Sequence, residues 1–226
     1  MKLLLMTGGP THPYERSTPI LEGFLINAGH EVIVREDSDA LSDGTLSNMD
    51  ALVFNTSRWD THPLEEHHQN SMADFISSGK GFVCIHISGA TSDSWPEYSN
   101  ITGGGWNRGN SHHPPYEKFH VDVSNSNHIC ANGLSGFDTY DERYMNIDFI
   151  EGNDVFLTVG FEGGVFEKNV SGNPAIEMPL GTFPIGWTRT YGKGKVFVTL
   201  LGHDDKSQGN DLFQKIILNG VDWVTH

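Results

Sequence analysis

Two apolar runs in this sequence each deliver a histidine to their far end. The run at residues 80–85 leads into His86, and the run at residues 195–202 leads into His203. Both runs have the length and the β-branched or aromatic content of buried strands. Because open α/β sheets bind ligands where their strands end, we expect the two imidazoles to lie at one rim. Imidazoles in that position could transfer protons, polarise a carbonyl group or bind a metal ion.

Further candidates for this rim lie in loops. His112 and His113 precede two prolines that fix the backbone. Since adjacent side chains diverge in an extended chain, we expect only His113 to point inward. Glu142 could be a general base, a metal ligand or half of a surface ion pair. His12 follows the turn after the first predicted strand and could reach the same rim.

The immediate neighbours of the strand-end histidines suggest supporting roles. Asp204 and Asp205 follow His203, and a carboxylate beside a histidine would orient the ring and raise its basicity. Cys84 lies two residues before His86, so it faces the same side of the strand but deeper. We therefore expect a structural thiol at Cys84 rather than a nucleophile.

Three residues are candidates for positioning a polar ligand. Trp187 and Arg189 belong to a predicted hairpin, where Arg189 could clamp the ligand and Trp187 could stack on a sugar or another planar face. Trp95 lies in an aromatic loop and is the third substrate-binding candidate. These residues predict a binding site beside the catalytic candidates.

The elements that must position these residues alternate between strand and helix along the first 90 residues. This alternation predicts an α/β fold with a mostly parallel sheet, right-handed crossovers and helices on both faces. The middle of the chain, residues 88–150, is rich in Gly, Asn, Ser and aromatics and is expected to be mostly irregular. We expect one domain, residues 1–226. The expected strands are 2–7, 31–35, 51–55, 81–87, 119–123, 155–160 and the hairpin 185–191 with 195–200, and the expected helices are 17–28, begun by Thr18-Pro19, 64–77 and 211–224.

Composition restricts the class of partner. The net charge of −15, from 29 acidic against 14 basic residues, argues against binding to nucleic acid or to an anionic membrane. The apolar stretch before Thr7 is too short for a signal-peptide core, and no stretch approaches a membrane span. Two cysteines do not make a disulfide framework, so a reducing cytoplasm is the expected location.

Several motifs are absent from the sequence. There is no Walker A segment, no Gly-x-Gly-x-x-Gly after the first strand and no Gly-x-Ser-x-Gly elbow. There is also no Cys-x-x-Cys and no His-Glu-x-x-His. No nucleotide cofactor is therefore expected, and serine hydrolases and thiol redox proteins are disfavoured.

The chain resembles the ThuA-like (trehalose utilisation) family over nearly its whole length. The residues that carry the resemblance are Lys80-Gly-Phe-Val-Cys-Ile-His86, Ala90-Thr91-Ser92-Asp93, Trp95-Pro96-Glu97-Tyr98, Gly103-Gly104, His113-Pro114, Asp141-Glu142-Arg143-Tyr144, Ile185-Gly186-Trp187-Thr188-Arg189, Tyr191-Gly192-Lys193-Gly194-Lys195, Leu201-Gly202-His203-Asp204 and Leu218-Asn219-Gly220-Val221-Asp222-Trp223. These motifs occur in the family's order and form a specific set. The doubled histidine at 112–113 and the long segment 167–184 depart from the usual pattern, which leaves the fine substrate specificity open.

The resemblance implies a flavodoxin-like, class I glutamine amidotransferase-like three-layer sandwich. In that alignment His86 occupies the position of the amidotransferase nucleophilic cysteine, and Ser88 replaces the glycine of the tight elbow. The amidotransferase His-Pro-Glu falls on the segment 203–205, so the acid is kept while the nucleophile is lost. The resemblance therefore argues against glutaminase chemistry.

The resemblance also implies a role in sugar catabolism, on oxidised (3-keto) disaccharides such as trehalose derivatives. A 3-keto sugar has an acidic C–H beside its carbonyl, which a base can abstract while a cation steadies the enolate. We expect Glu142 or His86 as the base and His113 and His203 as electrophiles or metal ligands, before isomerisation or elimination. A divalent metal, zinc or manganese, would bind His113 and His203 first and His86 third.

Two other functions remain open at this point, as does assembly into a homo-oligomer. A non-catalytic sugar-binding or accessory subunit would have an aromatic pocket without convergent titratable groups. A metal-dependent hydrolase would need a bound, activated water. The expected partner in all three cases is a small-molecule sugar.

Overall fold

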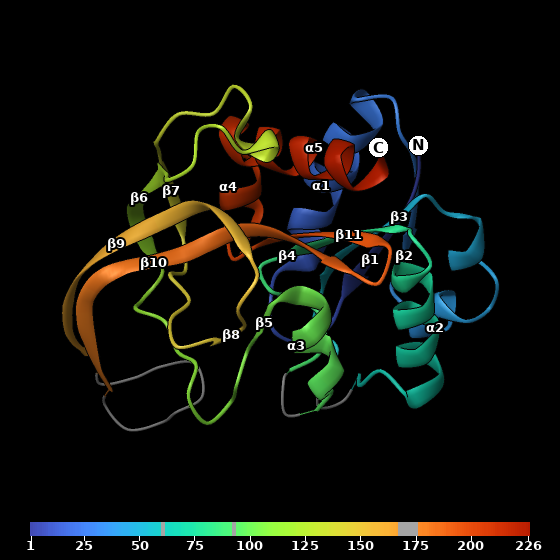
Figure 1. Cartoon of the computed structure of the whole chain (residues 1–226), viewed down its shortest axis with the longest axis horizontal. Coiled ribbons are helices and arrows are strands. Elements are labelled where there is room, and N and C mark those ends of the chain that lie inside the picture. The colour runs from blue at the N-terminus through green and yellow to red at the C-terminus, as the bar shows by residue number, and fades with distance from the viewer. Residues whose placement is uncertain (60–61, 92–93, 167–175) are drawn as a thin grey trace.

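The computed structural model describes residues 1–59, 62–91, 94–166 and 176–226 (Figure 1). Its core is a nine-stranded sheet in the order β2-β1-β3-β4-β11-β10-β9-β6-β7. A separate pair joins β5 to β8. The strands are β1 (Lys2–Gly8), β2 (Glu31–Arg35), β3 (Ala51–Thr56), β4 (Gly81–Ile85), β5 (Gly104–Gly105), β6 (Glu117–Val123), β7 (Phe137–Asp141), β8 (Asp148–Phe149), β9 (Asp154–Phe166), β10 (Ile176–Tyr191) and β11 (Gly194–Thr199).

The first half of the sheet is parallel, as the alternating pattern predicted. Strands β2, β1, β3, β4 and β11 pair in parallel, and all residues of β3 and β4 are buried. Strands buried on both faces are almost continuously apolar, which is why their runs were recognisable. The carboxyl ends of β4 and β11 therefore meet at one edge of the sheet.

The second half is antiparallel and grows from the long hairpin of β9 and β10. β10 pairs with β11 on one side and with β9 on the other, and β6 and β7 extend the sheet beyond β9. Figure 1 shows this part curving away from the parallel half. The predicted hairpin between β10 and β11 is confirmed.

Helices cover both faces of the parallel half (Figure 1). Helices α1, α4 and α5 lie on one face, where α5 contacts β4 and β11, and α2 and α3 lie on the other. This is the expected three-layer α/β arrangement, and the fold class is confirmed. The helices are α1 (Tyr14–Asn27), α2 (Glu66–Ser77), α3 (Pro96–Thr102), α4 (Asp205–Gln208) and α5 (Asp211–Thr225), with short 3₁₀ turns at Ser38–Leu41, Leu46–Asn48 and Ile129–Ala131.

Three local predictions need correction. Helix α1 begins at Tyr14, before the predicted start at Ser17, so Pro19 lies inside the helix rather than in its first turn. β4 ends at Ile85, because His86 and Ile87 turn the chain with positive φ. The middle of the chain is more regular than expected, since it supplies α3, β5, β7 and β8 in addition to β6, which was predicted as a strand at 119–123.

Two further sequence expectations concern cysteines and membranes. Cys84 and Cys130 are both free and buried. Within the described ranges of the chain, no helix has the length and apolar character needed to cross a bilayer.

Candidate active site

The turn after β4 fixes His86. His86 has φ 57° and the following Ile87 has φ 45°, a left-handed conformation that costs a non-glycine residue free energy. The ring is nearly buried, and its Nδ1 lies 2.6 Å from the carbonyl oxygen of Leu200 at the end of β11. A carbonyl oxygen can only accept, so Nδ1 carries the proton and Nε2 is the free nitrogen.

Asp141 at the end of β7 holds the neighbouring segments in place. This side chain is fully buried and accepts hydrogen bonds from the backbone N–H of Gly202 at 2.7 Å and of Glu142 at 2.9 Å. Gly202 has φ 118°, and a Cβ there would lie 2.6 Å from the side chain of Ile85, so glycine is required. Asp141 thereby sets the positions of Glu142 and of His203, which follows Gly202.

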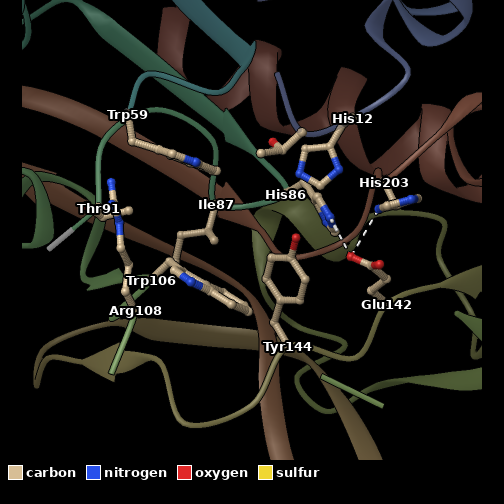
Figure 2. A pocket seen from close by; sticks show the side chains of 11 residues that line it. His12, Trp59, His86, Ile87, Thr91, Trp106, Arg108, Glu142, Tyr144 and His203 are labelled. Atoms are coloured by element: carbon tan, nitrogen blue, oxygen red, sulfur yellow. Dashed lines mark ion pairs between the residues drawn. The ribbon is translucent and has the colours of Figure 1, made fainter. Parts of the chain in front are cut away.

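Glu142 lies among three histidines. Its Oε2 is 3.0 Å from His203 Nδ1 and 3.5 Å from His86 Nε2, and its Oε1 is 3.5 Å from His113 Nε2. Figure 2 marks the first two ion pairs. The Glu142 side chain is only 11% exposed. A buried carboxylate with imidazoles around it differs from the surface ion pair that the sequence left open.

Electrostatics favour a charged carboxylate in this cluster. Burial alone would raise the pKa of Glu142, but the imidazoles of His203 and His86 outweigh burial and hold that pKa far below its usual value. Burial lowers the pKa of His203, but Glu142 more than compensates and raises it. Burial lowers the pKa of His113, which favours the neutral form of this ring. These shifts favour an ionised Glu142 and, among the rings of the cluster, protonation of His203.

His12 completes the histidine cluster. Its ring centroid lies 4.8 Å from that of His86 and 4.8 Å from that of His203. One ring nitrogen from each of the three residues lies within 4.8 Å of the other two. Burial lowers the pKa of His12 well below its usual value, and the two neighbouring histidines lower it further. The site thus contains four histidines and one carboxylate when His113 is included.

These groups form one wall of a cavity of about 280 Å³ (Figure 2). Trp59, Trp106 and Arg108 lie on the opposite side in Figure 2, and the buried Tyr144 reaches toward His86. The lining residues are Thr11, His12, Trp59, His86, Ile87, Thr91, Trp106, Arg108, Glu142, Tyr144 and His203. Aromatic faces beside a guanidinium and hydroxyl groups suit a polar ligand with flat C–H surfaces, such as a sugar.

The structure brings most of the predicted catalytic candidates together. His86, Glu142 and His203 line the cavity, whereas His113 reaches the site through Glu142 and does not line it. His112 faces elsewhere, because its Nε2 contacts Met178. One histidine of the pair therefore points to the site, as the loop geometry suggested.

The three predicted substrate-binding residues are not at this cavity, and this interpretation is corrected. Trp187 is fully buried, and its Nε1 donates to the carbonyl oxygen of Thr102 at 2.8 Å. Arg189 donates to Asn153 Oδ1 at 2.9 Å. Trp95 begins helix α3 and stacks on Tyr98. Strand alternation puts residues 187 and 189 on one face of β10, and helix α3 covers that face.

The acidic pair after His203 meets the expectation only in part: the charge of Asp204 helps to raise the pKa of His203, after the larger effects of Glu142 and Asp141, but neither carboxylate faces the ring. Asp204 is the N-cap of helix α4 and accepts from the backbone N–H of Lys206 and Ser207. Asp205 pairs with Arg16 at 3.2 Å. The carboxylate that faces the His203 ring is Glu142, which lies 61 positions earlier in the chain and was brought there by β7.

Cys84 behaves as the sequence predicted. It is fully buried inside β4, and burial raises the pKa of its thiol to about 12. Its Sγ contacts Ser88 and the hydroxyl of Tyr98 rather than the cavity. A thiol in this state is not a nucleophile at neutral pH.

Sequence reasoning missed the aromatic side of the cavity. Trp59, Trp106 and Arg108 lie on loops with no periodic pattern, and only their residue types hint at ligand binding. Tyr144 was visible as part of the motif that includes Glu142. His12 was recognised as able to reach the rim, and its position directly after the first strand was the available signal.

Comparisons with known proteins agree with this architecture. The family model described as ThuA, trehalose utilisation, matches residues 2–224. A ThuA-like protein from Parabacteroides merdae ATCC 43184 superposes with a TM-score of 0.75 at 21% identity, covering 100% of this chain and 90% of that one. A ThuA-like protein from Bacteroides uniformis ATCC 8492 gives 0.74 at 16% identity, covering 99% and 90%.

A protein described as cytoplasmic, from Salmonella typhimurium LT2, gives a TM-score of 0.65 at 13% identity and covers 100% of both chains. At such identities these structures show the fold alone. No curated protein matches the sequence. Because the family model spans almost the entire sequence, the chain belongs to the ThuA family, which is described by trehalose utilisation.

Proposed function

We propose that this protein is an enzyme that acts on keto-sugars, and that it abstracts a proton from the carbon next to the sugar carbonyl. The observation that carries the proposal is the position of the Glu142 carboxylate, which lies among histidines at the wall of an aromatic cavity. A base must be deprotonated in the resting enzyme and must lie at the substrate cavity. Glu142 meets both conditions.

The charge distribution of the cluster suits enolate formation. When Glu142 accepts the proton it becomes neutral, and the C–H electron pair moves to make the carbonyl oxygen an enolate. The positive charge that balanced Glu142, at the corner formed by His12, His86 and His203, then balances the enolate oxygen. Net charge in the buried site is unchanged, so the step does not leave an unpaired charge in a poorly solvated environment.

Two outcomes of the enolate are chemically balanced. Return of the proton from Glu142 to the former carbonyl carbon, together with transfer of the proton of the neighbouring hydroxyl to the enolate oxygen, gives an isomerised keto-sugar. Alternatively, in a 3-keto glycoside, the enolate re-forms the carbonyl and expels the glycosidic oxygen, which takes the proton held by Glu142. In both reactions His86 or His203 lies near the carbonyl oxygen, which changes charge, and Glu142 lies near the carbon that loses its proton.

The lining of the cavity supports a sugar as the substrate class. Trp59 and Trp106 offer flat apolar faces, and Arg108 and Thr91 offer polar contacts on the same side. The volume of about 280 Å³ is near the lower end of ligand pockets, about 300–1,000 Å³. It suits one sugar ring, with the second ring of a disaccharide outside it. Together with the family's description, this favours an oxidised trehalose derivative.

The first test is proton exchange, which does not require the final product to be known. Wild-type protein is incubated in D₂O with 3-ketotrehalose, 3-keto-glucosides and unoxidised trehalose, and NMR follows deuterium at the carbon beside the carbonyl. We expect exchange with the keto-sugars alone, and at least a 100-fold loss in Glu142→Gln. The matched control is Glu117→Gln, an exposed acid on β6 that pairs with Arg143.

Two results of this experiment would contradict the proposal. Sugar binding without exchange would indicate the accessory, non-catalytic role that the sequence left open. Full exchange in Glu142→Gln would assign the proton transfer to another group, with His86 the first candidate because its free Nε2 faces the same carboxylate.

A further inference from the structure

We propose that His12, His86 and His203 bind a divalent cation of the zinc type beside Glu142. The inference deepens the proposed function, because the cation would be the positive charge that receives the enolate. It replaces the ligand set expected from the sequence, in which His113 stood where the structure has His12. Its test measures metal binding and does not depend on turnover.

The first argument is that acceptor atoms face one another in this site. His86 Nδ1 lies 2.6 Å from the Leu200 oxygen, and His113 Nδ1 lies 2.7 Å from the Pro114 oxygen. Both Nδ1 atoms must donate, so in the neutral rings both Nε2 atoms carry lone pairs. Each Nε2 is 3.5 Å from an oxygen of Glu142, which is also an acceptor. Such an arrangement needs a cation or extra protons between the atoms.

The second argument is that three nitrogens in the cluster are buried without hydrogen bonds. His12 Nδ1, His86 Nε2 and His113 Nε2 have no hydrogen-bond partner among the described residues, and the group that faces His203 Nδ1 is the Glu142 carboxylate, 3.0 Å away. The side chain of His86 is 3% exposed, so water is poorly placed to satisfy it. Buried polar atoms without partners are rare in folded proteins, and an ion is one of the few explanations for several together.

Protons alone satisfy this cluster poorly. The ring centroids of His12, His86 and His203 lie 4.8 to 5.4 Å apart, so a proton on each ring would place like charges side by side. A proton on His203 pairs with Glu142 but leaves the other rings without partners. One divalent cation would satisfy several lone pairs at once and would balance the carboxylate.

The geometry and the ligand types point to zinc rather than to manganese. The three ring nitrogens lie within 4.8 Å of one another. Tetrahedral zinc with bonds of about 2.1 Å needs about 3.4 Å between ligand atoms, so binding would draw the rings slightly inward. Three imidazoles suit zinc, whereas manganese prefers oxygen ligands. Of the three proposed ligands, His86 has the Nδ1-to-carbonyl bond that orients metal-binding histidines.

A second group in the described structure supplies the matched control. Asp39, His67 and His68 also lie close enough to share an ion, but Asp39 and His67 are exposed. His68 Nε2 is 3.3 Å from Asp39, and His68 Nδ1 accepts from the backbone N–H of Glu65. Both nitrogens of His68 therefore have partners, and we expect this group to remain without zinc.

The experiment measures zinc binding by the purified, chelator-treated full chain. Equilibrium dialysis with elemental analysis should give one Zn²⁺ per chain. His12→Ala and His86→Ala should each weaken binding at least tenfold, whereas His67→Ala should bind as the wild type does. Circular dichroism checks that each variant folds. As a second readout, Co²⁺ in the same site should give visible absorption bands that His12→Gln alters while the chain stays folded.

Each outcome decides the proposal. Loss of the stoichiometric zinc in His12→Ala and in His86→Ala supports the site. Wild-type protein without stoichiometric binding, or binding that His67→Ala removes, overturns it. Unchanged binding in His12→Ala with a loss in His113→Ala would return the ligand set expected from the sequence. If zinc binds as described but no keto-sugar exchanges its proton, the metal site stands and the proposed reaction fails.

Discussion

The imidazole Nδ1 of His86 lies 2.6 Å from the carbonyl oxygen of Leu200, which joins the turn after β4 to the chain leaving β11. These two parallel strands are neighbours in the sheet. The bond therefore fixes the tautomer of His86 and aims its Nε2 at the cavity. A backbone carbonyl that follows the adjacent strand therefore orients a histidine that lines the cavity.

The left-handed turn at His86 predicts a graded response to substitution. Asn tolerates φ 57° better than a β-branched residue does. We expect His86→Val to be less stable than His86→Asn by about 1–2 kcal/mol in urea unfolding, and both variants to lose at least 100-fold in turnover. Equal stability of the two variants would show that the turn relaxes without strain.

Asp141 should act as a positioning residue. Asp141→Asn replaces one acceptor oxygen with a donor that faces backbone N–H groups of Glu142 and Gly202. Because hydrogen bonds to a buried charged group contribute about 1.5–3 kcal/mol each, we expect the free energy of unfolding to fall by about 2–3 kcal/mol. Turnover should fall at least tenfold, since both chain segments of the site lose their anchor.

The control for this prediction is Asp138→Asn. Asp138 lies on the same strand, β7, but its carboxylate is exposed and pairs with Lys118. Stability and turnover should stay close to those of the wild type. If Asp138→Asn lowered stability and turnover as much as Asp141→Asn does, the loss would come from changing any charge on β7. Asp141 would then not be a positioning residue for the site.

Cys84 should be unreactive in the folded protein. Its thiol pKa of about 12 means that about one molecule in ten thousand carries the thiolate at pH 8. The raised pKa favours the neutral thiol, so alkylation should increase tenfold per pH unit and still be slow at pH 9. Mass spectrometry after iodoacetamide treatment should find Cys84 modified only in urea. Cys84→Ala should retain turnover, and rapid modification of the native chain would contradict this assignment.

The sequence was sufficient for the parallel half of the fold because each strand there is a short apolar run followed by a turn residue. It was insufficient for the hairpin of β9 and β10. Gly163 and Pro179 lie within those strands and indicate turns when the sequence is considered alone. Pairing across the hairpin overrides that local preference, and pairing partners are not visible in a single sequence.

Because a single sequence does not show which distant segments meet, only part of the site could be predicted. His86 and His203 were predictable, since strand ends in a parallel sheet share one edge. The alternation of β10 showed that Trp187 and Arg189 share a face, but not that helix α3 covers it. The carboxylate partner of His203 was also out of reach, because Glu142 arrives from an antiparallel strand far away in the sequence.

The corrected aromatic assignment gives the last prediction, which compares two tryptophans. Trp106 lines the cavity and contacts Tyr144, whereas Trp187 is fully buried and donates to the carbonyl oxygen of Thr102. Trp106→Ala should raise the Kd for a non-reacting sugar such as trehalose about tenfold, or ~1.4 kcal/mol, as measured by calorimetry.

Trp187→Phe should destabilise the folded protein without changing its affinity for sugar. It leaves the Thr102 carbonyl without its donor, so the free energy of unfolding should fall by about 1–3 kcal/mol, while the Kd for sugar stays unchanged. Because the two substitutions affect different measurements, one pair of variants tests the assignment in both directions. If sugar binding weakened in Trp187→Phe and stayed unchanged in Trp106→Ala, Trp187 would be the sugar-stacking residue. The binding site would then lie on the far side of β10.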